Sequence, residues 1–199
     1  MGKFSVFCGS VLCVIVLLFG IPIHAQTTPN IFEPDRGPYQ LAMGYQYQSY
    51  KEAGHKFHDN GYNTDFSVHA FDWITGASLR VAVAAEGTVT MGFGGNTGGA
   101  TNLQAKSLFF GGGPHVSIVS NSRIEPWIHV LPGWQHFRFA QGSTGPGTSS
   151  AFGFMGGGGI DVRLTPLLYW RVQGDYIGTH FQHDLQSNFS IGSGFAFYF

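Results

Sequence analysis

Charged side chains are scarce in this sequence. Of 199 residues, 10 are Lys or Arg and 11 are Asp or Glu, so the charged fraction is 11%, against about a quarter in an ordinary soluble domain. The chain has no basic field to neutralise phosphates, which excludes nucleic acid as a partner. Intrinsic disorder is excluded as well, because aromatic residues make up 16% of the chain and the net charge is low.

Cysteine is confined to the first 25 residues, as Cys8 and Cys13. Residues 1–25 are typical of a secretory signal peptide, with an early lysine, an apolar run at 11–19 and a small-residue cleavage site at the end. A transmembrane helix is the alternative, but the run is short for one and Pro22 follows it. Cleavage would leave no cysteine, which excludes disulfides and thiol catalysis.

Long apolar runs are absent after residue 25. Helical membrane proteins are thereby excluded, because each of their spans needs about 20 apolar residues. Instead, neighbouring residues alternate in kind: between 189 and 199, the odd positions are large apolar residues apart from one serine, and the even positions are mostly small. A period of two predicts β-strands. After a flexible lead-in at 26–37, eight strands are expected, near 38–50, 60–71, 77–90, 103–118, 126–140, 150–164, 167–179 and 187–199.

These strands predict an all-β fold, an eight-stranded antiparallel up-and-down transmembrane β-barrel domain over residues 38–199. Short and longer connections alternate along the chain, as they do in such barrels, and about 9–11 residues suffice for a tilted strand to cross a membrane. The connections expected to be long, and therefore extracellular, are 51–59, 91–102, 141–149 and 180–186.

The distribution of polarity separates two kinds of barrel. A soluble lipocalin-type carrier would hold its apolar face inside and its charges outside. Here the mid-strand charges lie on the face opposite the large apolar residues, as where Arg171 and Asp175 alternate with Trp170 and Val172. This arrangement favours lipid outside and a polar lumen inside.

Three stretches near the C-terminus, 156–163 (GGGGIDVR), 171–176 (RVQGDY) and 188–199, resemble the closing strands of OmpA-type eight-stranded outer-membrane barrels. The resemblance extends in weaker form over 38–199. It implies the outer membrane of a Gram-negative cell as the location, outer-membrane lipid and lipopolysaccharide as the surroundings, and a monomer. Because the sequence ends at the eighth strand, it also implies a barrel-only member without a peptidoglycan-binding domain.

The last strand carries the residues of an assembly signal. Gly194, Phe197 and Phe199 match the terminal pattern of the resembled family, which implies the barrel assembly machinery as a partner during biogenesis. Gly192 departs from that pattern, since a polar residue is expected there.

Several charged residues are predicted to face the lumen. An eight-stranded barrel is just wide enough inside to be filled by side chains, and buried charges persist when they are paired. We therefore expect a structural charge network that plugs the lumen, with histidines 69, 115 and 129 on the same face and room left by the glycines of 111–113 and 156–159. The charged members are Arg80, Glu86, Asp161, Arg163, Arg171 and Asp175.

One tripeptide raises the possibility of an enzyme. Outer-membrane lipid A deacylases are eight-stranded barrels that use a His-x-Ser pair with a glutamate, and His115-Val-Ser117 has this spacing, with Glu125 further on. However, the strand pattern places His115 and Ser117 inside the barrel and Glu125 in a turn, whereas lipid substrates arrive at the outer wall. A nucleophile and its base must converge, so no catalytic residue is assigned.

Two of the expected long loops carry matching histidine pairs. His55 and His58 precede Asp59, and His180 and His183 precede Asp184. Because the first and last strands of an up-and-down barrel are neighbours, these loops are expected at the same rim, where four imidazoles and two carboxylates suit a zinc or copper ion. The alternative is that polar loops simply collect histidine. No cofactor is predicted.

The sequence therefore predicts a non-enzymatic outer-membrane barrel with a plugged lumen, acting as an envelope scaffold or through interactions of its surface loops. A narrow channel for small solutes is the alternative, and it would require the lumen charges to part. A lipid-modifying enzyme of the deacylase type is the third possibility.

Overall fold

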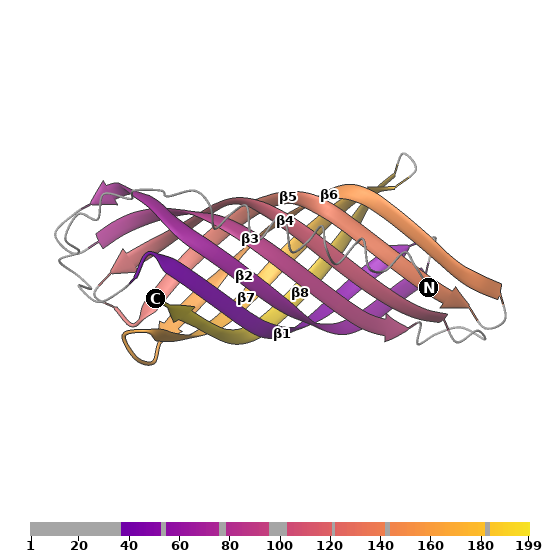
Figure 1. Ribbon diagram of the computed structural model, residues 1–199, viewed down its shortest axis with the longest axis horizontal. Coiled ribbons are helices and arrows are strands. Elements are labelled where there is room, and N and C mark those ends of the chain that lie inside the picture. Colours follow the sequence, from indigo (N-terminus) through magenta and orange to yellow (C-terminus); the bar gives the residue numbers. More distant parts are fainter. Residues whose placement is uncertain are drawn as a thin grey trace.

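Eight antiparallel strands form a closed barrel, as the ribbon in Figure 1 shows. The computed structural model describes residues 37–52, 55–75, 79–95, 103–120, 122–141, 144–181 and 184–199; the predicted signal peptide and nearly all of the lead-in lie outside them. Each strand pairs with the next, and the last pairs with the first. The predicted fold class is confirmed. The strands are β1 (Tyr39–Glu52), β2 (His55–Thr75), β3 (Leu79–Gly95), β4 (Leu103–Ser120), β5 (Ile124–Gln141), β6 (Thr144–Arg163), β7 (Leu168–Phe181) and β8 (Asp184–Tyr198).

The strands are longer than the sequence pattern predicted, and the four long loops expected from it are wrong in their bounds. Much of 51–59 belongs to β1 and β2, which pair as far as Glu52 and His55. β3 continues to Gly95, and β6 begins at Thr144. Antiparallel backbone pairing needs no apolar side chain, so the ladder continues past the apolar stretch that lipid can cover.

The two ends of the barrel are distinguished by their connections. We call the end that carries 76–78, 121–123 and 164–167 the turn end, and the end that carries 53–54, 96–102, 142–143 and 182–183 the loop end. The C-terminus lies at the turn end, on the left of Figure 1. No helix within the described part of the chain is long and apolar enough to span a membrane.

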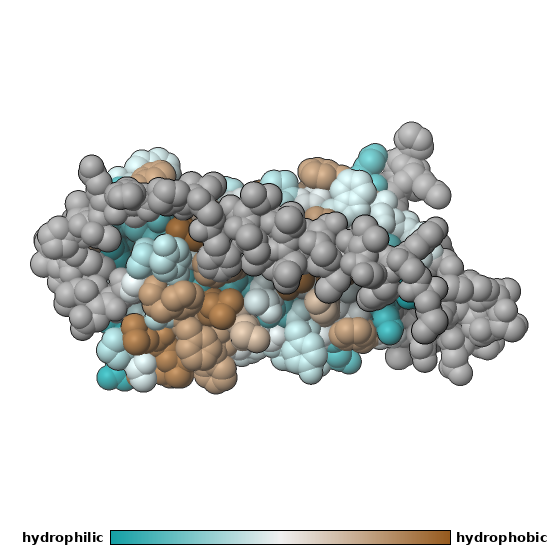
Figure 2. Space-filling view, viewed as in Figure 1, coloured by the Kyte–Doolittle hydropathy of each residue, from teal (hydrophilic) through white to brown (hydrophobic). Residues whose placement is uncertain are grey.

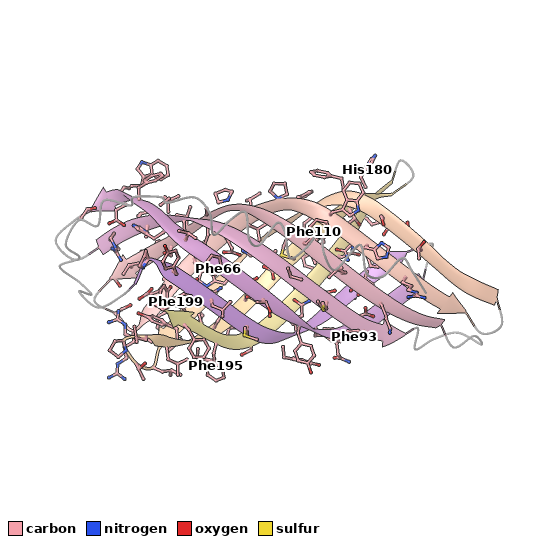
Figure 3. The ribbon with its side chains drawn as sticks, in the orientation of Figure 1. Phe66, Phe93, Phe110, His180, Phe195 and Phe199 are labelled. Carbon is pink, nitrogen blue, oxygen red and sulfur yellow. The ribbon has the colours of Figure 1, made fainter. Side chains whose placement is uncertain are left out.

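Large apolar side chains cover the outer wall. Figure 2 shows them gathered near the place where β8 ends, and in Figure 3 Phe195 and Phe199 point away from the barrel there. Nine of these side chains, on β1, on β8 and at the C-terminal residue, are each at least 40% exposed. An apolar outer band with aromatic residues towards its edges is typical of a membrane barrel. The large apolar residues therefore face outward, as the sequence pattern predicted. The set comprises Tyr39, Met43, Tyr45, Tyr47, Phe189, Ile191, Phe195, Phe197 and Phe199.

The seam between β1 and β8 depends on two facing glycines. The strands pair from Gln40 with Tyr198 to Ser49 with Phe189, and Gly44 lies opposite Gly194 in the middle. A methyl group on Gly194 would lie 2.1 Å from the carbonyl oxygen of Met43 and 2.4 Å from the Gly44 Cα atom. Backbone cannot move aside without opening the ladder, so only glycine fits this position at the observed spacing.

Replacing Gly194 with alanine is expected to lower the folded yield several-fold. The added methyl group would push β8 away from β1 and leave the ring open. The measurement is the fraction of purified protein, refolded in detergent, that migrates faster on a gel before boiling than after it. Gly156→Ala is the matched control, because nothing lies within 4 Å of a methyl group there. Equal folded yields for the two variants would show that the seam tolerates a side chain.

Candidate functional site in the barrel lumen

The strongest ion pair of the lumen joins Asp161 of β6 to Arg171 of β7. The two residues are direct neighbours in register, and each is 2% exposed. Arg171 donates from Nε to Oδ1 at 2.8 Å and from Nη2 to Oδ2 at 2.7 Å, the bidentate geometry that makes arginine–carboxylate pairs strong. Trp127 completes the pair: its indole nitrogen donates to Asp161 at 3.1 Å, and the guanidinium lies over its ring at 4.5 Å.

This pair is tied to the first two strands. Gln40 of β1 accepts a hydrogen bond from Arg171 Nη2 at 3.0 Å and donates to Asp161 Oδ2 at 3.2 Å. Asp65 of β2 lies 3.6 Å from Arg171 Nη1 and accepts from the hydroxyl of Thr88 at 2.6 Å. One guanidinium therefore links both sides of the β1–β8 seam.

A second chain of contacts crosses the lumen between opposite walls. Glu86 of β3 contacts Nδ1 of His115 and accepts from Nδ1 of His129 at 2.8 Å, and Nε2 of His129 lies 3.1 Å from Oδ1 of Asp175 on β7. In a ring of eight, β3 and β7 face each other. All four residues are at most 4% exposed. The chain from Glu86 through His129 to Asp175 is a bridge across the full width of the barrel.

The bridge can pass over β6 because residue 157 of that strand is a glycine and has no side chain. His129, Gly157 and Asp175 lie side by side in register on three successive strands. A methyl group on Gly157 would lie 2.1 Å from Oδ1 of Asp175, in the space that the imidazole and the carboxylate share. Within the cluster 156–159, this glycine makes the room that the sequence predicted for bulky partners.

Two of the six predicted charges lie apart from this centre, near the turn end. Arg80 is 3.5 Å from Asp72, and Arg163, which is part exposed, is 3.4 Å from Glu125. The prediction that Glu125 lies in a turn is wrong: it is the second residue of β5 and is 1% exposed. The other four, Glu86, Asp161, Arg171 and Asp175, form the central network.

Sequence reasoning missed four carboxylate or amide partners. Asp65 could have been found, since it alternates inward between Thr64 and Phe66 on a predicted strand. Asp72 follows register shifts in β2 between His69 and Ile74, and such bulges break the period of two. The missed partners are Gln40, Asp65, Asp72 and Glu125. His69 lies 3.5 Å from Asp72.

A layer without charge lies next to the bridge on its loop-end side. Phe109 and Leu131 are fully buried, and Met155 and Ile177 are 1% and 2% exposed; they extend from four successive strands, β4 to β7, and form one apolar cluster. Leu131, Met155 and Ile177 are adjacent in register. The apolar cluster lines the β4–β7 side of the lumen.

Beyond that layer, Tyr50 and Asp59 form a polar contact towards the loop end. The Tyr50 hydroxyl donates to Asp59, and its oxygen lies 2.7 Å from the hydroxyl of Ser107, while the ring packs edge-on against Phe137 at 5.3 Å. Tyr50 is 4% and Asp59 0% exposed. No sequence pattern indicated this contact, because 51–59 was expected to be a loop.

Three of the four histidines of the predicted rim site, His55, His58 and His180, lie in strands rather than in loops. His58 is in β2, where it stacks on Tyr47 at 5.7 Å and hydrogen-bonds its hydroxyl at 2.7 Å. Its neighbour Asp59 is buried and faces the lumen, so that His58 and Asp59 do not share a face of β2. His180 is exposed on β7, at the end of the barrel opposite Phe199 in Figure 3. The side chain of His55 and the whole of His183 lie outside the described residues.

His115 and Ser117 lie on the inner side of β4. His115 is 4% exposed, stacks on Trp127 at 5.0 Å and contacts Glu86. Glu125, the expected third member, is instead paired with Arg163. The arrangement orients an imidazole with a carboxylate, but it does so in the lumen rather than on the wall where lipid lies.

Solved structures show the same fold. Ail, the attachment invasion locus protein of Yersinia pestis, matches with a TM-score of 0.51 and 14% identity over 81% of this chain and 99% of that one. Neisserial surface protein A matches with a TM-score of 0.57 and 10% identity over 82% and 98%. Both are eight-stranded outer-membrane barrels. No family model and no curated protein sequence matches the chain.

Removing Arg171 is expected to destabilise the barrel more than removing any exposed arginine. Arg171→Ala would leave Asp161 and Asp65 as buried carboxylates without a cation, and breaking a buried pair in this way costs about 3–5 kcal/mol. Arg171→Lys should lie between, because it keeps the charge and loses the bidentate geometry. Urea unfolding of the refolded barrel measures the difference. Arg138→Ala, at an exposed position on β5, is the control; a loss as small as in that variant would contradict the role of the pair.

Proposed function

We propose that this outer-membrane β-barrel has a plugged lumen and acts as a non-enzymatic envelope scaffold or surface interaction protein rather than as a pore. One observation carries the proposal: charged and apolar side chains fill successive layers of the lumen. The Glu86–His129–Asp175 bridge spans opposite walls. The apolar cluster of Phe109, Leu131, Met155 and Ile177 lies next to it on the loop-end side.

A solute crossing this lumen would meet two barriers of different kinds. At the bridge it would have to part hydrogen-bonded charges, and removing one partner of a buried pair is costly. Along the apolar cluster, an ion would find no ligand on the β4–β7 side to replace its water, and losing hydration without replacement is costly. Both barriers support a plugged lumen rather than a narrow channel.

With the lumen filled, the surfaces left for function are the outer wall and the loop end. Ail is by its name an attachment and invasion protein, and the Neisserial protein a surface protein, which supports a role in contacts made outside the cell. On the wall, outer-membrane lipid and lipopolysaccharide are the proposed partners. Tyr45, Tyr47 and Tyr62 are 52%, 40% and 65% exposed, and tyrosine suits the interface between lipid and water.

The end of β8 supports the proposed recognition by the barrel assembly machinery. Phe197 and Phe199 are 44% and 57% exposed on the outer wall, where another protein can contact them before the barrel enters the membrane. Gly194 lies at the seam that closes last if β8 joins β1 after the other pairs. A monomer is proposed, because the ring has no free strand edge to offer a second copy.

Single-channel recording in a planar bilayer tests the plugged lumen. The refolded wild-type protein is expected to give no steady conductance, because no water-filled path crosses both barriers. The insertion of folded protein is checked by recovering it from the bilayer lipid and running it unboiled on a gel. A stable open level in the wild type would contradict the proposal and favour the channel.

Mass spectrometry of lipid A tests the enzyme alternative. Cells that produce the wild-type barrel and cells that produce Ser117→Ala are expected to carry lipid A with the same acyl chains, because Ser117 faces the lumen. Cells without the protein give the reference pattern. Loss of an acyl chain that depends on Ser117 would overturn the non-enzymatic proposal.

A further inference from the structure

Three metal-binding side chains converge inside the barrel, away from the rim histidines. Glu86, His115 and His129 come from three successive strands, β3, β4 and β5, and each offers one ligand atom such that all three atoms lie within 4.8 Å of one another. We propose that these residues bind a divalent transition-metal ion of the zinc class in the lumen. The site shares Glu86 and His129 with the bridge that supports the plugged lumen, and it involves neither the loops nor the outer wall.

The donor atoms suit such an ion. Two imidazole nitrogens and one carboxylate are a common zinc ligand set, which leaves a fourth position open, and imidazole also suits copper and nickel. Both histidines turn the same nitrogen, Nδ1, towards Glu86: His115 contacts one carboxylate oxygen, and His129 lies 2.8 Å from the other. The ion would take the place of the protons now held between these atoms, so binding would release protons to solvent.

Neighbouring residues fix the rings in the orientation that a metal ligand needs. The second nitrogen of His129, Nε2, lies 3.1 Å from Asp175, and a carboxylate on the far nitrogen is the usual support of a metal-bound histidine. Trp127 packs against both rings, at 5.0 Å from His115 and 5.1 Å from His129. The ligands are therefore held by groups that are themselves buried.

The charge balance of the central network favours a cation. Four buried carboxylates, those of Asp65, Glu86, Asp161 and Asp175, face one buried arginine, Arg171. With both histidines neutral, the network carries three negative charges in excess, and buried charge without a counterion is costly. A divalent ion at Glu86 would remove two of the three. Protonation of the two histidines would also reduce the excess negative charge. The experiment must therefore distinguish a bound metal ion from bound protons.

The first measurement is metal retention. Mature protein is refolded in detergent with zinc, passed over a desalting column that contains a chelator, and analysed for zinc by mass spectrometry. Because all three ligands are at most 4% exposed, exchange should be slow, and about one zinc ion per barrel should stay bound. Zinc added after folding should load more slowly than zinc present during folding. Wild-type protein that retains no zinc under either condition overturns the proposal.

Variants then locate the ion. His115→Gln and His129→Gln should each abolish retention, and Asp175→Asn should weaken affinity by about tenfold or more, as expected for a residue that supports a ligand. His58→Gln, on the outer wall, is the matched control and should retain zinc fully. Zinc that persists in both lumen variants, or that is lost only when His180 and His183 are replaced, would overturn the lumen site and favour the rim.

Cobalt provides a readout that needs no variant. Co²⁺ bound to two imidazoles and a carboxylate in a four-coordinate site gives strong visible absorption, whereas hexahydrated Co²⁺ gives little. The wild-type barrel refolded with Co²⁺ should show this band, and zinc should compete it away. Each variant is first checked for faster gel migration before boiling, so that loss of metal is not confused with loss of the fold. Folded wild-type protein without the band would contradict the proposed ligand set.

Discussion

Everything in this structure depends on the pairing of β1 with β8. In lipid, a backbone N–H or C=O without a partner costs several kcal/mol, so a sheet can cross a membrane only when its two edges meet. Ten residue pairs from Gln40 to Ser49 make that closure, and the facing glycines 44 and 194 allow it. Once the ring is closed at eight strands, its interior width is set, and the lumen side chains must fit what remains.

The lumen is filled in layers that match the width of the ring. Arg171 binds Asp161 beside it and reaches Gln40 across the seam, while His129 spans β6 to reach Asp175. Gly157 leaves the space beside Asp175 that this contact needs. The abundance of glycine in this sequence is therefore partly a packing requirement of the interior. The apolar cluster on the loop-end side of the bridge packs its part of the lumen without charged side chains.

The sequence was sufficient to predict the fold and four of the central charges, those of Glu86, Asp161, Arg171 and Asp175, because a period of two reports directly which side chains share a face. Asp65 follows the same period and was missed. The ends of the strands were not predictable in this way. His55, Asp59 and the start of β6 lie beyond the apolar stretch, where pairing continues without a side-chain pattern. Asp72 was hidden by the register shifts in β2, and the contact between His129 and Asp175 was hidden because it joins strands that are not neighbours.

The bridge from Glu86 through His129 to Asp175 also has a mechanical meaning. A thin-walled cylinder under the lateral pressure of a bilayer deforms most easily by flattening into an ellipse, which changes the distance between opposite walls. β3 and β7 are such walls, and the hydrogen bonds between them tolerate only small changes in length. A strut across the diameter therefore resists flattening in that direction, and it keeps the cross-section of the barrel near circular while the surrounding lipids move.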